Sequence, residues 1–138
     1  MDLPASSELA LTGLPFGAGK REVRACFEGE PQPFRRTPDS EPADYWPDLG
    51  IFAYYDAAER LEALEFAAAA RPTLLGQVVT TLSLPKAKAL LASLDPELEE
   101  EGTMVISRGL GMSVWTGAGP RGKVQSVLRF APGYYDLG

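Results

Sequence analysis

The sequence predicts an α+β domain in which two tandem α-β-β-β units form one antiparallel sheet with both helices on one face. A segment beginning Leu49-Gly50 is repeated at Leu110-Gly111, and each copy carries an aromatic residue at its sixth position, Tyr54 or Trp115. A short apolar stripe with helical spacing precedes each copy. The chain has 138 residues, close to the usual size of a single domain, so the two units are expected to share one core.

Each unit is expected to begin with a short helix. Gly19 occupies the cap position of the first helix, and Ser83 is a favourable N-cap for the second, where Pro85 is tolerated in the first turn. The predicted buried stripe of the first helix is Val23, Cys26 and Phe27. That of the second helix is Ala87, Leu90, Leu91 and Leu94.

Strands follow each predicted helix. In the first unit we expect strands at 34–37, 49–55 and 61–67, with a long loop at 38–48. In the second, an acidic loop at 97–101 leads into strands at 103–107, 110–116 and 125–131. An additional strand at 73–80 is expected to link the halves. The predicted divisions of the single domain, residues 1–138, are repeat 1 at about 12–70, the linking strand, repeat 2 at about 82–131 and a tail at 132–138.

Strand alternation predicts which side chains face the helices. Three extra residues in the second turn align Phe66-Ala67 with Phe130-Ala131. The residues expected on the helix-covered face are Ile51, Ala53, Leu64, Phe66, Met112, Val114, Leu128 and Phe130. Those expected on the opposite face are Phe52, Tyr54, Glu65, Ser113, Trp115, Gln125 and Arg129. Aromatic and arginine side chains are typical anchors of protein interfaces, so the opposite face is the leading candidate for a binding surface.

Composition excludes several kinds of catalytic site. The chain has no histidine and one cysteine, Cys26, so it lacks the commonest general base and every Ser-His or Cys-His pair. A zinc site would need three or four nitrogen or sulfur ligands. We therefore predict no metal, no cofactor and no disulfide, and we expect Cys26 to pack as a small apolar residue.

Charge and hydropathy indicate the environment. The formal charge of −6 disfavours nucleic acid as a ligand and is compatible with a partner that is basic at its contact surface, although such a charge also simply keeps a small domain soluble. There is no run of about 20 apolar residues that could span a bilayer. The N-terminus has no basic and apolar signal segment, which predicts a cytoplasmic location without membrane contact.

The predicted loop at 38–48 is a second candidate binding surface. Tyr45 and Trp46, flanked by Asp44 and Asp48, could insert into a partner, or Trp46 could fold back and fill the edge of the core. Together with the sheet face, this gives a candidate partner-binding set of Asp44, Tyr45, Trp46, Asp48, Phe52, Tyr54, Glu65, Trp115 and Arg129.

Three other motifs have less specific interpretations. The acidic run at 97–101 could mimic a ligand of a basic active site, but a solvated loop is the simpler interpretation. The glycine-rich segment at 117–123 lacks the Gly-Lys-Ser/Thr ending of a phosphate loop and predicts a hairpin turn. Glu62 and Glu65 could form a glycosidase-like carboxylate pair, although no third group is positioned with them.

A tandem helix-and-meander arrangement resembles the fold shared by β-lactamase inhibitor proteins and outer-membrane assembly lipoproteins of the SmpA/OmlA type. The segment from Leu14 to Val23, with Gly17 in a turn before the helix, is similar to the opening of those units. In the inhibitors, the two units present a concave sheet face to a target enzyme. This chain differs from them because it has no export signal, lipoprotein cysteine or disulfide.

A narrower resemblance covers residues 49–56, 62–66 and 133–136, which look like small bacterial cytoplasmic proteins associated with immunity to polymorphic toxins. It implies a non-catalytic protein that neutralises a cognate toxin by occluding its active site. The alternatives are a small carboxylate-based hydrolase and a structural or assembly module. A pocket with two converging carboxylates would favour the hydrolase, and self-association through a sheet edge would favour the assembly module.

Overall fold

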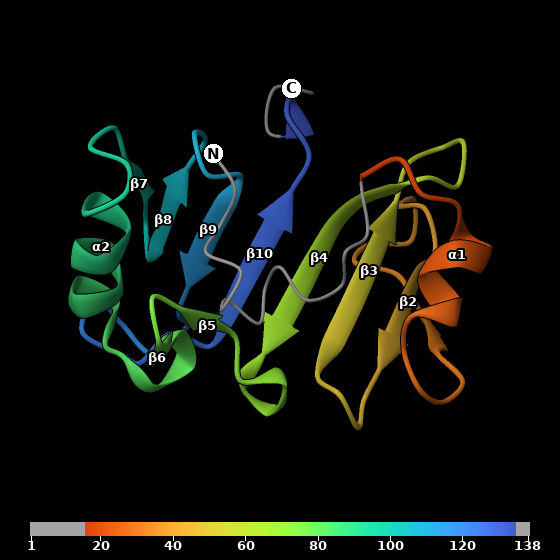
Figure 1. Cartoon of the computed structure of the whole chain (residues 1–138), viewed down its shortest axis with the longest axis horizontal. Coiled ribbons are helices and arrows are strands. Elements are labelled where there is room, and N and C mark those ends of the chain that lie inside the picture. Colours follow the sequence, from red (N-terminus) through yellow and green to blue (C-terminus); the bar gives the residue numbers. More distant parts are fainter. Residues whose placement is uncertain (1–15, 135–138) are drawn as a thin grey trace.

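The structure, a computed structural model, describes residues 16–134 and contains an eight-stranded antiparallel sheet with two α-helices (Figure 1). The predicted start of repeat 1 at residue 12, with Leu14 and Pro15, and the tail residues Tyr135 and Asp136 lie outside the described residues. The strand order is β1-β2-β3-β4-β10-β9-β8-β7. These strands are β1 Gln32–Phe34, β2 Ala43–Trp46, β3 Ile51–Tyr55, β4 Leu61–Ala67, β7 Glu99–Glu101, β8 Met104–Ser107, β9 Met112–Trp115 and β10 Ser126–Phe130. The α+β class is confirmed.

Both predicted helices form. α1 spans Lys20–Ala25 after Gly19, and α2 spans Leu84–Ala92, where the Ser83 hydroxyl accepts a hydrogen bond from the Lys86 N–H. The prediction that Cys26 is buried is wrong. α1 ends at Ala25, one residue before Cys26, and the Cys26 thiol is exposed. Val23 alone of the α1 residues is buried.

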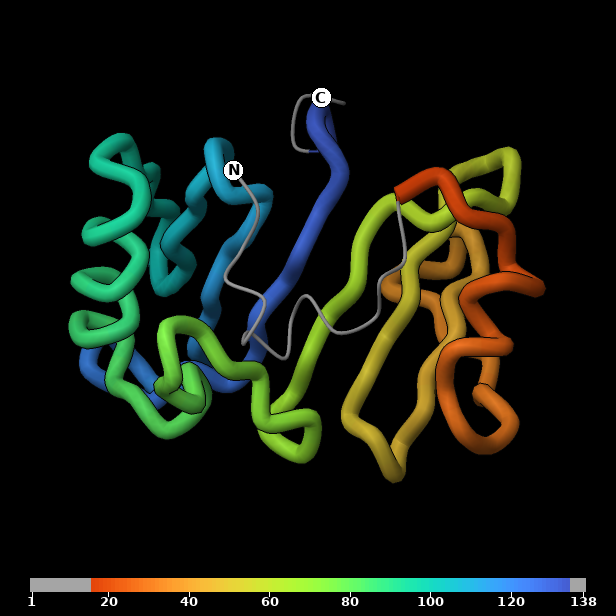
Figure 2. Tube along the Cα trace, viewed as in Figure 1, coloured from red at the N-terminus to blue at the C-terminus, as the bar shows by residue number. Residues whose placement is uncertain are grey.

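Each half of the chain consists of a helix followed by four strands, one more than expected. The additional strands are β2, which lies in the predicted loop at 38–48, and β7, which the acidic run forms. Figure 2 shows the two halves at opposite ends of the sheet, joined where β4 lies beside β10. The sheet is therefore continuous across the middle of the molecule.

The segment at 73–80 does not join this sheet. It forms its own hairpin of β5 Thr73–Leu74 and β6 Gln77–Val78, and then a 3-10 turn at Val79–Thr81. Leu74 and Val79 are buried in the main core, so the base of the hairpin is anchored while its tip, Leu75 and Gly76, is exposed. A 3-10 turn at Ala68–Ala70 connects β4 to it.

The registers of the β3–β4 and β9–β10 pairs correct the predicted alignment of the two halves. Tyr54 pairs with Ala63, and Trp115 pairs with Ser126. The connection between β9 and β10 is therefore two residues longer than the one between β3 and β4, not three as predicted. A β-bulge between Tyr54 and Tyr55 adds a residue to the first half. Because a shift of one residue exchanges the two faces of a strand, Leu128 and Phe130 lie opposite the predicted face.

Both helices pack on one face of the sheet, here called the first face. Val23 of α1 and Leu91 of α2 belong to the same apolar core. The sheet residues of this core include Ala53, Leu64, Phe66, Met112, Val114 and Val127. The opposite side, here called the second face, carries a separate cluster around Tyr54, Ala63, Ile106 and Phe130.

The two outer strands are protected against pairing with another chain. β1 contains Pro33, which has no N–H to donate, and β7 consists of three exposed glutamates. Lys88 and Arg108 form ion pairs with Glu100 and Glu99, respectively. These edges do not favour assembly by strand addition.

Within residues 16–134, no helix has the length and apolar composition needed to cross a membrane.

Candidate functional site

Five of the predicted contact residues come together on the second face. Tyr45 of β2, Phe52 and Tyr54 of β3, Glu65 of β4 and Trp115 of β9 all point to this side of the sheet. Phe52 pairs with both Tyr45 and Glu65 in the sheet register, and cross-strand partners share a face.

Stacked aromatic rings cover the first-half part of this face. The Tyr45 and Phe52 rings are stacked with centroids 4.3 Å apart, and the Phe52 and Tyr54 rings are parallel at 6.2 Å. Phe34 packs edge-on against Phe52 at 5.2 Å. Such pairs add to apolar burial and hold the rings in fixed orientations.

Tyr54 connects the aromatic rings to two charged side chains, Glu65 and Arg36. Its hydroxyl donates a 2.5 Å hydrogen bond to Glu65 Oε1, and the Arg36 guanidinium lies 3.7 Å from its ring centroid. Burial, together with the hydrogen bond and the negative charge of Glu65, raises the pKa of Tyr54, so this hydroxyl remains a donor. Arg36 also approaches the Tyr134 ring, at 5.8 Å, and thereby places the β1–β2 loop over the second face.

A depression of about 410 Å³ lies next to this group. It extends from Arg36 and Glu65 to Trp115 and crosses the junction of the two halves. Its remaining lining residues are Met104, Ser113, Ser126 and Leu128. A shallow apolar floor with a few polar groups is the general form of a binding pocket.

Trp115 is the most exposed large apolar side chain of this face, with 44% of its surface accessible. Gly117 provides the space for its ring, because a Cβ at that position would lie 3.0 Å from the Trp115 Cη2 atom. The Gly117 N–H is itself held by the Gln125 side chain at 2.9 Å. The glycine-rich segment is thus a turn, as predicted, and it positions an exposed indole.

Glutamates of β7 continue the cross-strand rows of the second face. Glu101 pairs with Met104, and Met104 pairs with Trp115, so the three residues form one cross-strand row. Glu99 lies in the same way beside Ile106 and is paired with Arg108. The acidic run is therefore an edge strand that directs two carboxylates to the second face.

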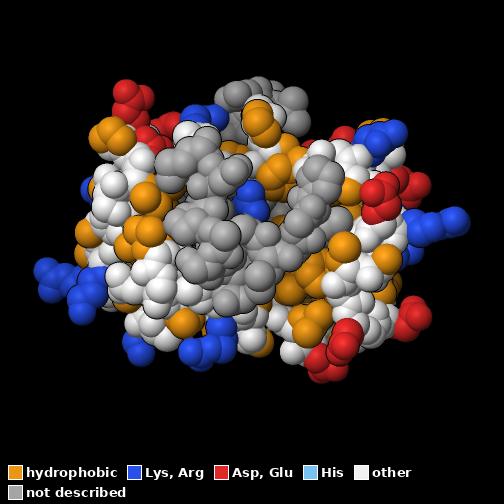
Figure 3. All heavy atoms as spheres, viewed as in Figure 1, with side chains coloured by type: hydrophobic (Ala, Val, Ile, Leu, Met, Phe, Trp, Pro, Cys, Tyr) orange, Lys and Arg blue, Asp and Glu red, His pale blue; other side chains and the backbone are white. Residues whose placement is uncertain are grey.

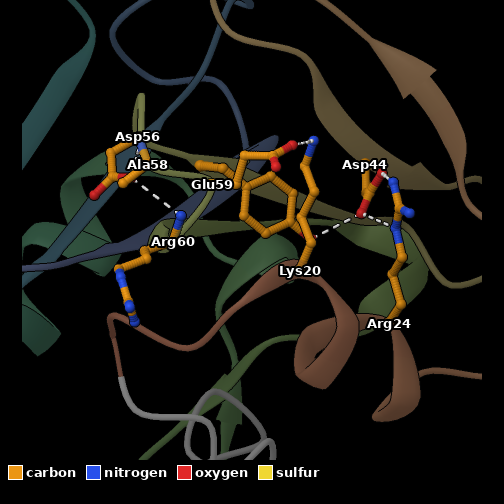
Figure 4. Close-up of polar contacts among 8 residues, drawn as sticks. Lys20, Arg24, Asp44, Asp56, Ala58, Glu59 and Arg60 are labelled. Atoms are coloured by element: carbon orange, nitrogen blue, oxygen red, sulfur yellow. Dashed lines mark hydrogen bonds and ion pairs between the residues drawn. The ribbon is translucent and has the colours of Figure 1, made fainter.

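Asp44 lies in the interior, although it was predicted to contact a partner. It is 3% exposed and accepts two hydrogen bonds of 2.8 Å from Arg24 and one of 2.7 Å from the Tyr55 hydroxyl (Figure 4). Burial acts to raise the pKa of Asp44, but the hydrogen bonds and charge of Arg24 and the Tyr55 bond lower it overall. Asp44 thus fastens α1 to the sheet.

Trp46 is also in the interior, with 2% of its surface exposed. Its ring packs 4.9 Å from Phe27, and its indole N–H donates to the Gly29 carbonyl at 3.3 Å. Of the two sequence interpretations, the structure supports the one in which Trp46 fills the core. Asp48 is exposed in the β2–β3 turn and lies outside the depression.

Arg129 lies on the first face, which corrects its predicted position. It pairs with Leu64 in the sheet, and its guanidinium is 5.7 Å from the Phe16 ring. The reason is the one-residue shift that also moves Phe130. Burial lowers the pKa of Arg129.

Glu62 and Glu65 line different depressions, because Glu62 lies in a second one, of about 460 Å³. It is lined by Glu62 and Asp56, together with Phe16, Leu61 and Tyr134. Burial and the nearby Asp56 charge raise the pKa of Glu62. One oxygen of Asp56 accepts the N–H groups of Ala58 and Arg60 and so closes the β3–β4 turn.

Sequence reasoning missed several residues that line the Trp115 depression. Arg36 was assigned to a strand, and its place over Tyr54 depends on the path of the loop that follows β1. Met104 and Leu128 could have been found from strand alternation, given the correct register.

Among residues 16–134, no three His, Cys, Asp or Glu side chains are grouped as a metal site.

Charged side chains of both signs lie on the helix side of the molecule. In Figure 3, the coloured side chains of the described residues show acidic and basic groups together at both ends of this side. The second face combines an exposed indole with carboxylates and with the Arg36 guanidinium. Comparison of the chain with protein families, curated proteins and solved structures gives no match in any of the three.

Proposed function

We propose that this chain is a non-catalytic protein-binding protein that contacts its partner through the second face, centred on Trp115. The observation that carries the proposal is the exposure of this indole beside a depression with a carboxylate at its rim. An exposed tryptophan in such a setting loses water-accessible apolar area when a partner covers it, and tryptophan is enriched among binding hot spots.

The charge of this face supports a basic partner. Three glutamates, Glu65, Glu99 and Glu101, point to it. Two arginines offset part of this charge, since Arg36 lies over Tyr54 and Arg108 is paired with Glu99, and the whole chain carries a formal charge of −6. Complementary charge accelerates association and orients the partner. The resemblance of residues 49–56 and 62–66 to immunity-associated proteins further suggests that the partner is a bacterial toxin whose active site the chain occludes in the cytoplasm. The helix-then-strands order of each half is consistent with a duplicated unit.

The test is to purify the chain with the toxin domain encoded beside its gene and to measure their affinity. Trp115→Ala should weaken the complex by about 30-fold, as expected for a hot-spot residue. Leu75→Ala is a matched control, because Leu75 is similarly exposed, at 41%, but lies on the β5–β6 hairpin. No complex at micromolar concentration, or no toxin gene, would refute the proposed partner, and full affinity of the Trp115→Ala protein would refute the surface.

The depression at Asp56 and Glu62 favours hydrolysis as a second candidate function. It contains two carboxylates, and burial raises the pKa of Glu62, as a general acid requires. Asp56 Oδ1 closes the β3–β4 turn, whereas its Oδ2 accepts no backbone hydrogen bond from residues 16–134. A screen of chromogenic glycosides with the native chain and Glu62→Gln decides this candidate: turnover abolished by the substitution would support it, and no turnover by the native chain would reject it.

A further inference from the structure

We propose that the depression between Glu65 and Trp115 binds an arginine side chain of the partner. This inference rests on the proposed function, in which the second face is the contact surface, and it specifies the chemistry of the group that the face recognises.

The floor suits the aliphatic part of an arginine. Leu128 of β10 supplies apolar surface between the strands of Glu65 and Trp115, and Met104 of β8 adds apolar surface beside Trp115. The three methylene groups of an arginine can pack along such a surface while the guanidinium remains at the rim. A short or branched apolar side chain would cover the floor but would leave the polar rim unused.

Glu65 supplies the opposite charge. Its Oε1 atom accepts the Tyr54 hydroxyl, and none of the described lysine or arginine nitrogens forms an ion pair with it within 4.0 Å. The other oxygen is thus available to a guanidinium N–H. A charge-assisted hydrogen bond at this position would exceed what a neutral amide or hydroxyl donor could provide.

Trp115 supplies a flat ring that lines the same depression. Planar guanidinium groups stack on indole rings better than ammonium groups do, which favours arginine over lysine. Gly117 leaves room for this ring, which is 44% exposed.

The second face already contains one such arrangement. Arg36 stacks on Tyr54 at 3.7 Å, and Glu65 accepts the hydroxyl of the same tyrosine. Glu65 therefore has two aromatic neighbours. One is Tyr54, on which the Arg36 guanidinium stacks, and the other is Trp115, which lines the same depression as Glu65. Because Arg36 is engaged with Tyr54, it does not take the place at Trp115.

The probe is N-acetyl-arginine methylamide, titrated into the full chain and followed by the indole N–H signals of an ¹⁵N spectrum. The Trp115 signal should shift with a dissociation constant of about 1–10 mM, while that of the buried Trp46 stays fixed. The citrulline analogue, which has the same shape without the charge, should bind about fivefold more weakly. The lysine analogue should fall between the two.

Variants assign the contact. Glu65→Gln keeps an acceptor for Tyr54 and should remove the preference for arginine over citrulline. Trp115→Phe keeps a ring and should retain part of the affinity, which the chemical shifts of the neighbouring Gln125 would report. Glu28→Gln, an exposed acid after α1, is the matched control and should change nothing.

Equal binding of arginine and citrulline, or no Trp115 shift at about 50 mM probe, would overturn the proposal, since millimolar affinity is the least that it requires. These results are separable from the test of the proposed function. Failure of the toxin complex with intact arginine binding would reject the toxin partner alone. A toxin complex weakened by Trp115→Ala but unaffected by Glu65→Gln would reject the arginine site alone.

Discussion

Replacing Asp44 by alanine tests the interior role that the structure gives to this residue. The change removes the acceptor of three hydrogen bonds, two from Arg24 and one from Tyr55. α1 has six residues and one buried side chain, Val23, so the Asp44 bonds are a main part of its attachment, beside the Lys20–Glu59 ion pair and the backbone hydrogen bonds of residues 17 and 18 with Leu61. We therefore expect a large loss of stability from a single substitution.

The size of this loss follows from the exposure of each partner. The Tyr55 side chain is 3% exposed, so its hydroxyl would lose its acceptor in the interior, at a cost of about 2 kcal/mol. The Arg24 side chain is 49% exposed and regains water, so its contribution is reduced to about 1 kcal/mol. The sum of about 3 kcal/mol corresponds to a decrease in Tm of roughly 10 °C for a chain of this length.

Urea unfolding at pH 7, followed by tryptophan fluorescence, measures this free energy. Glu100→Ala is the control, because its ion pair with Lys88 is exposed on both sides, at 44% and 58%, and should contribute less than about 1 kcal/mol. Adding Tyr55→Phe to Asp44→Ala should cost less than the two single changes together, since the orphaned hydroxyl is removed. A loss below about 1 kcal/mol for Asp44→Ala would refute the reasoning.

Acidification should remove the Asp44 contribution: its pKa is lowered in the folded chain, so the stabilisation is complete above about pH 5 and is lost as the pH falls through the folded pKa. The difference in unfolding free energy between the native chain and Asp44→Ala should accordingly shrink as the pH falls below about 4, the ordinary pKa of an aspartate, and a constant difference would contradict this. Leu75→Asn should stabilise the chain by about 1 kcal/mol in thermal unfolding, because Leu75 (φ 52°) precedes Gly76 (φ 78°) in a left-handed turn that favours Asn-Gly. An unchanged or lower Tm would show that the leucine is not strained. The Cys26 thiol should react with a disulfide reagent in the folded chain about as fast as after unfolding, since it is exposed, and strong protection would place it inside.

The local signals in the sequence predicted the elements that depend on nearby residues. Ser83 and Pro85 identified the start of α2, and the Leu-Gly pairs identified the entries to β3 and β9. Gly50 and Gly111 both have positive φ, 68° and 66°, which explains why glycine occurs at both places. Such features are encoded within a few residues and can be read directly.

The errors arose where distant residues decide the outcome. The bulge at Tyr54 and Tyr55 has no sequence signature, and it shifted the alignment that placed Arg129 and Phe130. Trp46 could have faced either way until its partners Phe27 and Gly29 were known. The Trp115 depression brings together side chains from β4, β8, β9 and β10 and the loop after β1, so the sequence predicted its aromatic and acidic members but not their arrangement.

The pairing of β4 with β10 also bears on how the chain is made. β4 ends at Ala67, whereas β10 begins at Ser126, so a ribosome synthesises the second half before the central seam can close. A first half that folds during this interval presents β4 as an open edge. β4 has no proline, and only two of its seven residues are glutamates, whereas β1 contains a proline and β7 consists of three glutamates. The molecule is therefore most exposed to aggregation during synthesis, and truncation before residue 126 leaves that edge permanently open.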